Sequence, residues 1–176
     1  MTKVFIGGSR KISRLGPEVK ARVDNIIAGD FTVLIGDAEG ADKAVQAYLA
    51  ERGFKKVVVY CMAEKCRHNL GGWDVQSIHA GKNVKGFEYY ATKDRAMAQD
   101  ATYGFMIWDG KSKGSMNNIR NLLALRKSVL VYLHPNQEFV TVRTSAELDL
   151  LLSNRHPQTR ESLAAFGAHS DSSKGI

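Results

Sequence analysis

The sequence predicts an α/β protein with a Rossmann-like, doubly wound fold: a mostly parallel five-stranded sheet with helices on both faces. Short runs of β-branched and aromatic residues alternate along the chain with segments whose apolar residues recur at helical spacing. Some runs, such as residues 31–35 (FTVLI), are apolar throughout, which is typical of strands covered on both faces. Strands joined through helices in this way run parallel.

The first half of the chain alternates three predicted strands with two predicted helices. Pro17 suits the first turn of a helix because its ring fixes φ and its missing N–H would have no helical partner there. Gly53 ends the second helix, since a left-handed residue commonly follows the last turn. The predicted strands are residues 3–6, 31–35 and 56–61, and the predicted helices are residues 18–28 and 41–52.

The segment 62–90 has no clear periodicity and contains several glycines. A connection of this length is either a functional loop or disorder, and its aromatic residues argue against disorder. Regular spacing returns after it. We expect helices at residues 91–101, 115–126 and 145–152, strands at 103–108 and 129–133, and an edge strand at 139–142.

The length of 176 residues fits one domain, which we assign to residues 1–153, followed by a polar, partly disordered C-terminal extension at 154–176. The sequence has no run of about 18 apolar residues that would predict a membrane span. Its N-terminus does not resemble a secretory signal. We therefore expect a cytoplasmic protein with reduced Cys61 and Cys66. These cysteines have too few nearby ligands for zinc, so no metal site is expected.

The formal net charge of +7 favours anionic partners. Lysines and arginines are spread over several stretches, which is more typical of a solvated surface than of a nucleic-acid footprint. The expected partner is accordingly a small-molecule nucleotide. Nucleic acid is the less favoured alternative, and no membrane partner is expected. We also expect a homo-oligomer, and no cofactor beyond the nucleotide ligand is indicated.

Three loops rich in small residues follow predicted strands, at residues 7–10, 36–42 and 109–115. Because the carboxyl ends of parallel strands meet at one edge of the sheet, we expect these loops to form a single ligand site. The predicted ligand-binding residues are Gly7, Gly8, Ser9, Arg10, Gly36, Asp37, Gly40, Ala41, Asp42, Arg95, Asp109, Ser112, Gly114, Ser115 and Asn118.

The loop 109–115 leads into a helix whose first N–H groups have no internal partners, which is an arrangement suited to phosphate. The plain alternative is that Ser112 or Ser115 only caps that helix. Arg10 offers a planar guanidinium suited to phosphate or carboxylate, beside glycines that allow close backbone approach.

The acidic loop 36–42 lacks the lysine of a Walker motif, and its carboxylates would repel a phosphate. Asp37 and Asp42 are better suited to ribose hydroxyls, or Asp42 caps the following helix and orients the loop. Glu39 and Asp94 are the candidate catalytic acids. The scattered histidines do not suggest a catalytic triad.

These motifs together resemble the SLOG superfamily of Rossmann-like proteins, and most closely its YspA/YpsA-related branch. The resemblance rests on GGSR at 7–10, GDAEGAD at 36–42, KDRAM at 93–97 and WDGKSKGS at 108–115, and it spans roughly residues 3–133. It implies a pocket for nucleotides or nucleotide derivatives at the sheet edge, and a binding or sensing role.

More distant relatives in that superfamily imply two alternatives. Lonely Guy phosphoribohydrolases carry a glutamate in a PGGxGTxxE loop, and deoxyribosyltransferases need a similar glutamate, whereas this chain has Asn117 and Asn118 there. Asparagine cannot act as nucleophile or general base, so an N-glycosidic-bond hydrolase or transferase would have to use Glu39 or Asp94. DNA-processing protein A binds single-stranded DNA, which would require aromatics such as Trp73, Tyr89 and Tyr90 on a basic groove.

Overall fold

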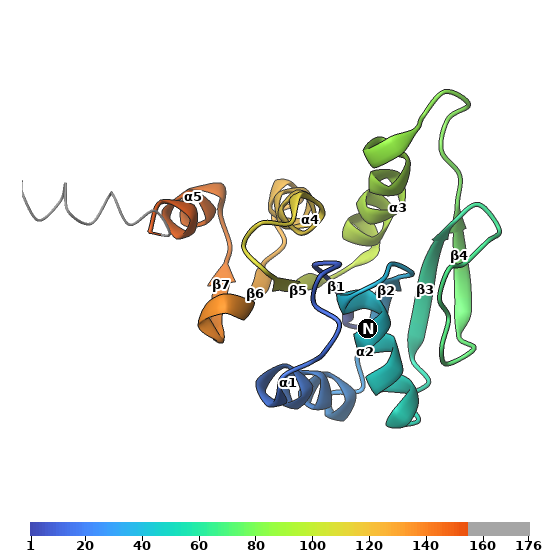
Figure 1. Ribbon diagram of the computed structural model, residues 1–176, viewed down its shortest axis with the longest axis horizontal. Helices are drawn as coiled ribbons and strands as arrows, with labels where there is room; N and C mark the ends of the chain where they lie inside the picture. The colour runs from blue at the N-terminus through green and yellow to red at the C-terminus, as the bar shows by residue number, and fades with distance from the viewer. Residues whose placement is uncertain (155–176) are drawn as a thin grey trace, which may run out of the picture.

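Seven strands form one sheet in the computed structural model, which describes residues 1–154 (Figure 1). Their order across the sheet is β4-β3-β2-β1-β5-β6-β7. The strands are β1 (Lys3–Gly8), β2 (Thr32–Gly36), β3 (Val57–Met62), β4 (Asp74–Ile78), β5 (Tyr103–Trp108), β6 (Val129–Leu133) and β7 (Glu138–Val142). The helices are α1 (Pro17–Ala28), α2 (Ala41–Glu51), α3 (Gly86–Asp100), α4 (Lys113–Ala124) and α5 (Ser145–Ser153), with a 3-10 turn at His134–Asn136.

The Rossmann-like, doubly wound prediction is confirmed, but the predicted number of strands is wrong. All neighbouring strands run parallel except β6 and β7, which are antiparallel. The expected edge strand becomes β7. The missed strand is β4, whose sequence DVQSI lacks an apolar run because it lies at the sheet edge and leaves its side chains largely exposed.

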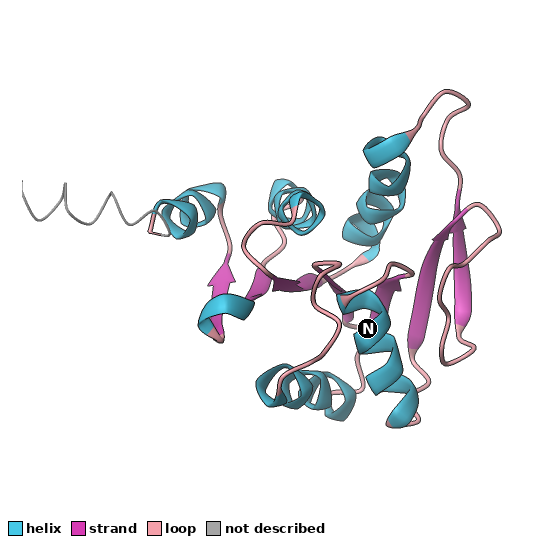
Figure 2. Ribbon diagram, in the orientation of Figure 1, coloured by secondary structure: helices cyan, strands magenta, loops and turns pink. Residues whose placement is uncertain are grey.

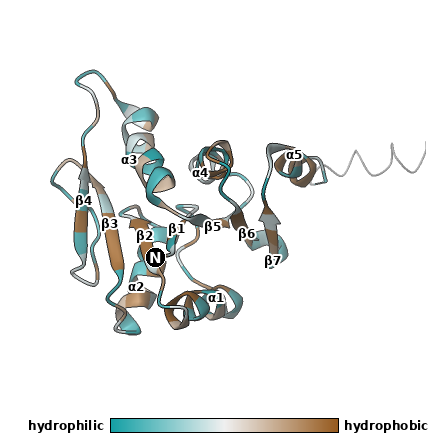
Figure 3. Cartoon of the chain, turned by 180° about the vertical axis from the view of Figure 1, so that it is seen from behind, coloured by the Kyte–Doolittle hydropathy of each residue, from teal (hydrophilic) through white to brown (hydrophobic). Residues whose placement is uncertain are grey.

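The strands alternate their apolar side chains between two cores. Val4 and Ile6 of β1 face α1 and α2 on one side, while Phe5 faces α3 and α4 on the other. Helix α5 joins the second core through Leu148. Figure 3 shows that hydrophobic sequence (brown) gathers on the strands of the sheet. Burial on both faces explains why most strands are continuously apolar.

The order of the strands reverses between β1 and β5. The chain moves outward from β1 to β4 and then returns through α3 to place β5 on the other side of β1. The loops after β1 and β5 therefore lie side by side at the carboxyl edge (Figure 1). In doubly wound proteins this is where ligands bind.

Two helices begin earlier than predicted. Helix α3 starts at Gly86 instead of Ala91, and α4 starts at Lys113 instead of Ser115. Gly86 has a positive φ of 62° and lies at the end of the segment without periodicity, and the first turn that follows it is largely solvent-exposed. The predicted C-terminal extension at 154–176 lies outside the described residues, except for Asn154.

The expectation of reduced cysteines is wrong in this structure, because Cys61 and Cys66 form a disulfide with Cα atoms 5.0 Å apart. Ala63 adopts a left-handed conformation (φ 52°) directly after β3, which turns the chain so that Cys66 comes back beside the end of that strand. Among residues 1–154, no helix has the length and apolar character needed to cross a bilayer. Within the same range, no cluster of three or more acidic, His or Cys side chains is arranged to hold a metal ion.

Candidate ligand cavity

A cavity of about 540 Å³ opens at the carboxyl edge of the sheet, between the loops after β1, β2 and β5 and the first halves of α3 and α4. Its size is that of a site for a small organic ligand. The cavity brings together most of the predicted site residues: Gly7, Gly8, Arg10, Asp42, Asp94, Asp109, Ser112, Gly114, Ser115 and Asn118. The other predicted residues, Ser9, Gly36, Asp37, Glu39, Gly40, Ala41 and Arg95, do not line it.

Close backbone packing explains the glycines of the first two loops. A Cβ on Gly8 would lie 2.3 Å from the carbonyl oxygen of Ile107 on β5. Gly40 has a positive φ of 81°, and a Cβ there would lie 2.2 Å from the carbonyl oxygen of Arg10. The loop after β2 therefore packs directly on the loop after β1, which holds the Arg10 backbone at the cavity wall.

Ser9 joins the loops that surround the cavity. Its hydroxyl donates to Asp109 Oδ1 at 3.0 Å and accepts from the backbone N–H of Asp109. Its carbonyl oxygen accepts from Ala41 N at 3.2 Å. Ser9 is fully buried. Its side chain therefore holds the loops that form the cavity walls in place and does not face a ligand.

Asp109 shapes the loop that leads into α4. Its Oδ1 accepts from the backbone N–H groups of Lys111 and Ser112 at 2.9 and 2.8 Å. Burial alone would raise the pKa of Asp109, but these hydrogen bonds hold it below its ordinary value. The Asp109 carboxylate thus accepts hydrogen bonds from its own loop, and these bonds orient the start of α4 toward the cavity.

The N-terminus of α4 combines a cap with positive charge. The cap predicted for Ser112 is confirmed, since its Oγ accepts from Ser115 N at 3.4 Å. Lys111 and Lys113 are exposed beside it, and the first turn of α4 contains no acidic residue. The unpaired N–H groups of this turn and the two lysines create a positive potential at the cavity wall.

Asn118 lies further along α4 and also lines the cavity. Its side chain is only 7% exposed, and its Oδ1 has no hydrogen-bond partner among the described residues. A buried amide oxygen without a partner is costly, so a ligand hydroxyl or amino group in reach of this side chain would be favoured.

A buried charge cluster forms the cavity floor. Lys93 is 3% exposed and donates from Nζ to Asp94 Oδ1 at 2.8 Å. Burial alone would lower the pKa of Lys93, but the Asp94 and Asp42 carboxylates raise it above its ordinary value, so the amine stays charged. Burial raises the pKa of Asp42 to about 6, despite the opposing effect of Lys93.

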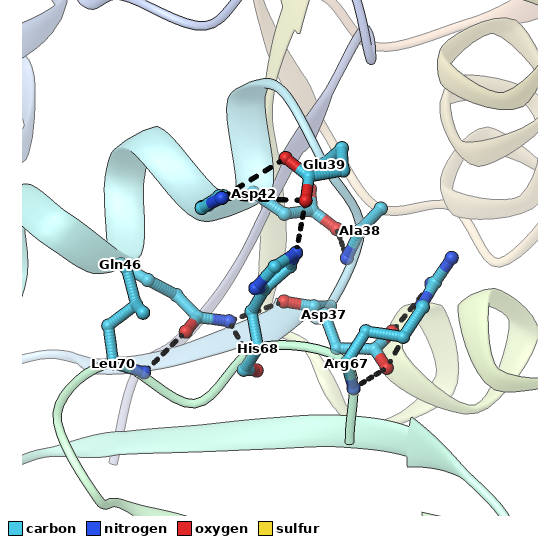
Figure 4. A network of polar contacts seen from close by, with 10 residues as sticks. Asp37, Ala38, Glu39, Asp42, Gln46, Arg67, His68 and Leu70 are labelled. Atoms are coloured by element: carbon cyan, nitrogen blue, oxygen red, sulfur yellow. Dashed lines mark hydrogen bonds and ion pairs between the residues drawn. The ribbon is translucent and has the colours of Figure 1, made fainter. Parts of the chain in front are cut away.

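The connection between β3 and β4, residues 63–73, is fastened to the loop after β2 (Figure 4). Asp37 accepts from Arg67 at three donors: the backbone N–H at 3.0 Å, Nε at 3.2 Å and an η nitrogen at 2.7 Å. Helix α2 fastens the same connection through Gln46, whose side-chain amide donates to His68 O and accepts from Leu70 N. Asp37 is therefore engaged by Arg67 and is not free for the ribose contact that was expected.

The two candidate catalytic acids occupy different places. Glu39 is exposed and shares its carboxylate between Lys43 and His68, outside the cavity lining. Asp94 lines the cavity beside Lys93. Arg95 points elsewhere and pairs with Glu88 along α3.

Sequence reasoning missed several residues that the fold brings to the cavity, namely Lys11, Arg67 and Phe87, and it considered Tyr90 only as a contact for a nucleic-acid strand. The guanidinium carbon of Arg67 lies 4.7 Å from the centre of the Tyr90 ring, and that of Arg10 lies 5.8 Å from it. Arg67 and Phe87 come from the segment without periodicity, which offered no signal beyond its aromatic content. Figure 2 shows this segment as loops on both sides of β4.

Trp73 does not belong to this surface. Its indole N–H donates to Phe54 O at 2.8 Å, and its ring is buried in the core beneath α1 and α2. The suggestion that Trp73 stacks on nucleic acid is therefore wrong, because its ring is buried and anchors the β3–β4 connection in the hydrophobic core.

No family model and no curated protein matches this chain. Two solved structures of DNA processing protein A are similar in fold. The Helicobacter pylori protein, described with a unique single-stranded DNA binding mode, has a TM-score of 0.55 and 17% identity, covering 74% of this chain and 64% of that one. The Streptococcus pneumoniae protein has a TM-score of 0.52 and 18% identity, covering 74% of this chain and 50% of that one.

This chain thus spans 64% and 50% of the lengths of those two structures. At these identities the likeness is one of fold, and it agrees with the expected relation to DNA processing protein A. The narrower placement in the YspA/YpsA-related branch, and the link to Lonely Guy phosphoribohydrolases, remain predictions.

Proposed function

We propose that this protein binds a nucleotide or nucleotide derivative in the cavity at the carboxyl edge of its sheet. The observation that carries the proposal is the meeting, in one cavity of about 540 Å³, of the α4 N-terminus, the Gly7–Gly8 backbone, Arg10 and Asn118. Each of these groups suits a different part of a nucleotide.

Phosphate is assigned to the start of α4. Free N–H groups, Ser115 and the lysines at 111 and 113 surround this end of the cavity, and together they stabilise an anion through hydrogen bonds and the helix dipole. Arg10 adds a guanidinium from the facing loop. The negative charge of Asp109 repels this anion only weakly, because backbone N–H groups of its own loop already donate hydrogen bonds to the carboxylate.

Hydroxyl or amino groups of the ligand are assigned to Asn118 and Asp94. The unpartnered Oδ1 of Asn118 needs a donor, and Asp94 offers an acceptor at the same cavity. An asparagine at this position supports binding over bond cleavage, since its amide is neither nucleophile nor general base.

A thermal-unfolding panel tests the proposal with nucleoside mono-, di- and triphosphates, dinucleotides and ADP-ribose. A ligand at 100 times its Kd should add about 2.7 kcal/mol to the free energy of unfolding. The double substitution Lys111→Gln/Lys113→Gln should weaken that response by roughly tenfold in Kd, since each lysine contact with phosphate is a charge-assisted hydrogen bond.

The matched control is Lys55→Gln, which removes an exposed lysine before β3 at the opposite, amino edge of the sheet. This variant should respond like the wild type. A flat response of the wild-type protein across the whole panel would contradict the proposal.

A second candidate is binding of single-stranded nucleic acid. The specific observation in its favour is the exposure of Phe87 and Tyr90 at the cavity, beside Arg10, Lys11 and the lysines of the α4 loop. Exposed aromatic rings among cations are the usual means of holding single strands. The fold shared with DNA processing protein A supports the same candidate.

A further inference from the structure

We propose that Phe87 and Tyr90 of α3 form a stacking subsite for a nucleobase, at the opposite side of the cavity from the phosphate end on α4. This inference rests on the proposed nucleotide-binding function and assigns the orientation of the ligand within the cavity. It makes these two aromatic residues the determinants that select base-containing ligands over phosphorylated sugars.

The two rings share one face of α3. Residues three apart in a helix are neighbours on its surface, and both side chains line the cavity. Phe87 is 53% exposed and Tyr90 is 37% exposed, although both are large apolar side chains. Large apolar side chains that stay exposed where they line a cavity offer surface to a ligand.

Tyr90 is held in place by its surroundings. The Arg67 guanidinium lies over its ring, and the Tyr89 ring contacts its edge at 5.2 Å between centroids. Arg67 is in turn fixed by three hydrogen bonds to Asp37. The Tyr90 ring is thus pre-organised through Arg67, which is bonded to the loop after β2. This pre-organisation reduces the entropy lost when a base binds.

Phe87, in contrast, has no ring or cation contact within the described part of the chain. Bases stack on phenylalanine, tyrosine and arginine planes. A base placed against Phe87 would therefore have an aromatic surface on α3 and the Arg67 plane nearby.

The charges of the cavity decide which end of a nucleotide lies where. On the α3 side, Lys93 is already paired with Asp94, and the Asp42 carboxyl lies near its amine. A phosphate there would meet two carboxyl groups, and the Arg67 guanidinium over Tyr90 is already paired with Asp37. On the α4 side it meets free N–H groups and two exposed lysines. The phosphate therefore takes the α4 side and leaves the aromatic side to the base.

The same chemistry, a base next to a phosphate, is offered by a free nucleotide and by a single strand. The experiment has an arm for each. Adenosine 5′-monophosphate, ribose 5-phosphate and an eight-residue oligodeoxyadenylate are titrated into the full chain by calorimetry. The variants are Phe87→Leu and Tyr90→Leu, which remove the rings, and Phe87→Trp, which keeps one.

We expect Phe87→Leu and Tyr90→Leu each to weaken binding of adenosine 5′-monophosphate by on the order of tenfold. Ribose 5-phosphate affinity should stay unchanged in both, and Phe87→Trp should bind the nucleotide at least as tightly as the wild type. Phe139→Leu, on β7 outside the cavity lining, is the matched control and should have no effect. If the oligonucleotide loses affinity by the same factor, the subsite serves a strand as well.

Unchanged nucleotide affinity in both ring-removing variants would overturn the stacking subsite while leaving the proposed function intact. The same holds if ribose 5-phosphate binds the wild type as tightly as the nucleotide does. Absence of binding by all three probes, together with a flat response to the whole nucleotide panel, would overturn the proposed function itself.

Discussion

Asp42 shows how the fold changes the meaning of a single residue. In the sequence it is one of several acids in a loop after a strand, suited to a ribose or to a helix cap. In the structure it is 7% exposed, accepts from Ala38 N at 3.3 Å, and lies in the cavity floor with Lys93. Burial, with smaller contributions from Asp94 and Asp37, raises its pKa to about 6.

This raised pKa predicts a pH dependence of stability. The folded state retains the Asp42 proton between the ordinary pKa of 3.8 and about 6, so the free energy of unfolding should fall as pH rises through that window. Relative to Asp42→Asn, the wild type should lose on the order of 3 kcal/mol across it. Urea denaturation at several pH values measures this, and a constant difference between the two proteins would refute it.

Asn118 is the residue that most favours ligand binding over bond cleavage. It follows the Gly114–Ser115 start of α4, near the place where a relation to Lonely Guy phosphoribohydrolases would predict a glutamate, and it lines the cavity. Its amide oxygen has no hydrogen-bond partner among the described residues, which supports the proposed ligand contact. Of the two candidate catalytic acids, Asp94 lines the same cavity, and its carboxylate is paired with Lys93.

At the scale of elements, the β3–β4 connection is the part that most changes the site. It is joined to β3 by the Cys61–Cys66 disulfide and to the loop after β2 by the Asp37–Arg67 contacts. Burial alone would raise the pKa of Asp37, but its bonds to Arg67 hold it below the ordinary value, so this fastening persists at neutral pH. These two fastenings hold the adjacent residues Cys66 and Arg67, and Arg67 lines the cavity.

Reduction of the disulfide should therefore loosen this connection. A closed loop with a sequence separation of 5 contributes roughly 2 kcal/mol through chain entropy. Adding a thiol reductant should lower the free energy of unfolding by about that amount and increase hydrogen exchange at residues 63–73. Cys66→Ser is the control, because it should have the lower stability without reductant and no further response to it. Identical wild-type unfolding curves with and without reductant would exclude this role.

At the scale of the whole molecule, the switch in strand order places the cavity, and the charge distribution decides its character. The loops after β1 and β5 are adjacent because β1 pairs with β5 in parallel. The chain carries a formal net charge of +7, and the cavity rim contains several of its exposed cations, including Arg10, Lys11, Lys111 and Lys113. Such a surface attracts phosphates at a distance.

Binding of a single strand, the second candidate, predicts a steep salt dependence. If about four phosphates contact cations, the logarithm of the binding constant should fall against the logarithm of salt with a slope of roughly −3. Lys111→Gln/Lys113→Gln should make this slope shallower by about 1.4, whereas Lys55→Gln should leave it unchanged. Fluorescence anisotropy with labelled oligonucleotides measures the slope, and the absence of salt-sensitive binding would remove this candidate.

The sequence alone determined the order of the helices and of every strand except β4, because burial on both faces imposes apolar runs and helical spacing that are local in the chain. It also determined that three small-residue loops meet at one edge, since this follows from parallel connectivity. Only the tertiary structure decided that Asp37 holds Arg67, that Lys93 is buried and that Phe87 and Tyr90 face the cavity. These facts depend on contacts between residues far apart in the chain, such as Asp37 and Arg67, and on exposed segments such as β4 and the start of α3. Contacts between distant residues leave no local pattern, and β4 has no apolar run because a solvent-facing edge strand is free to be polar.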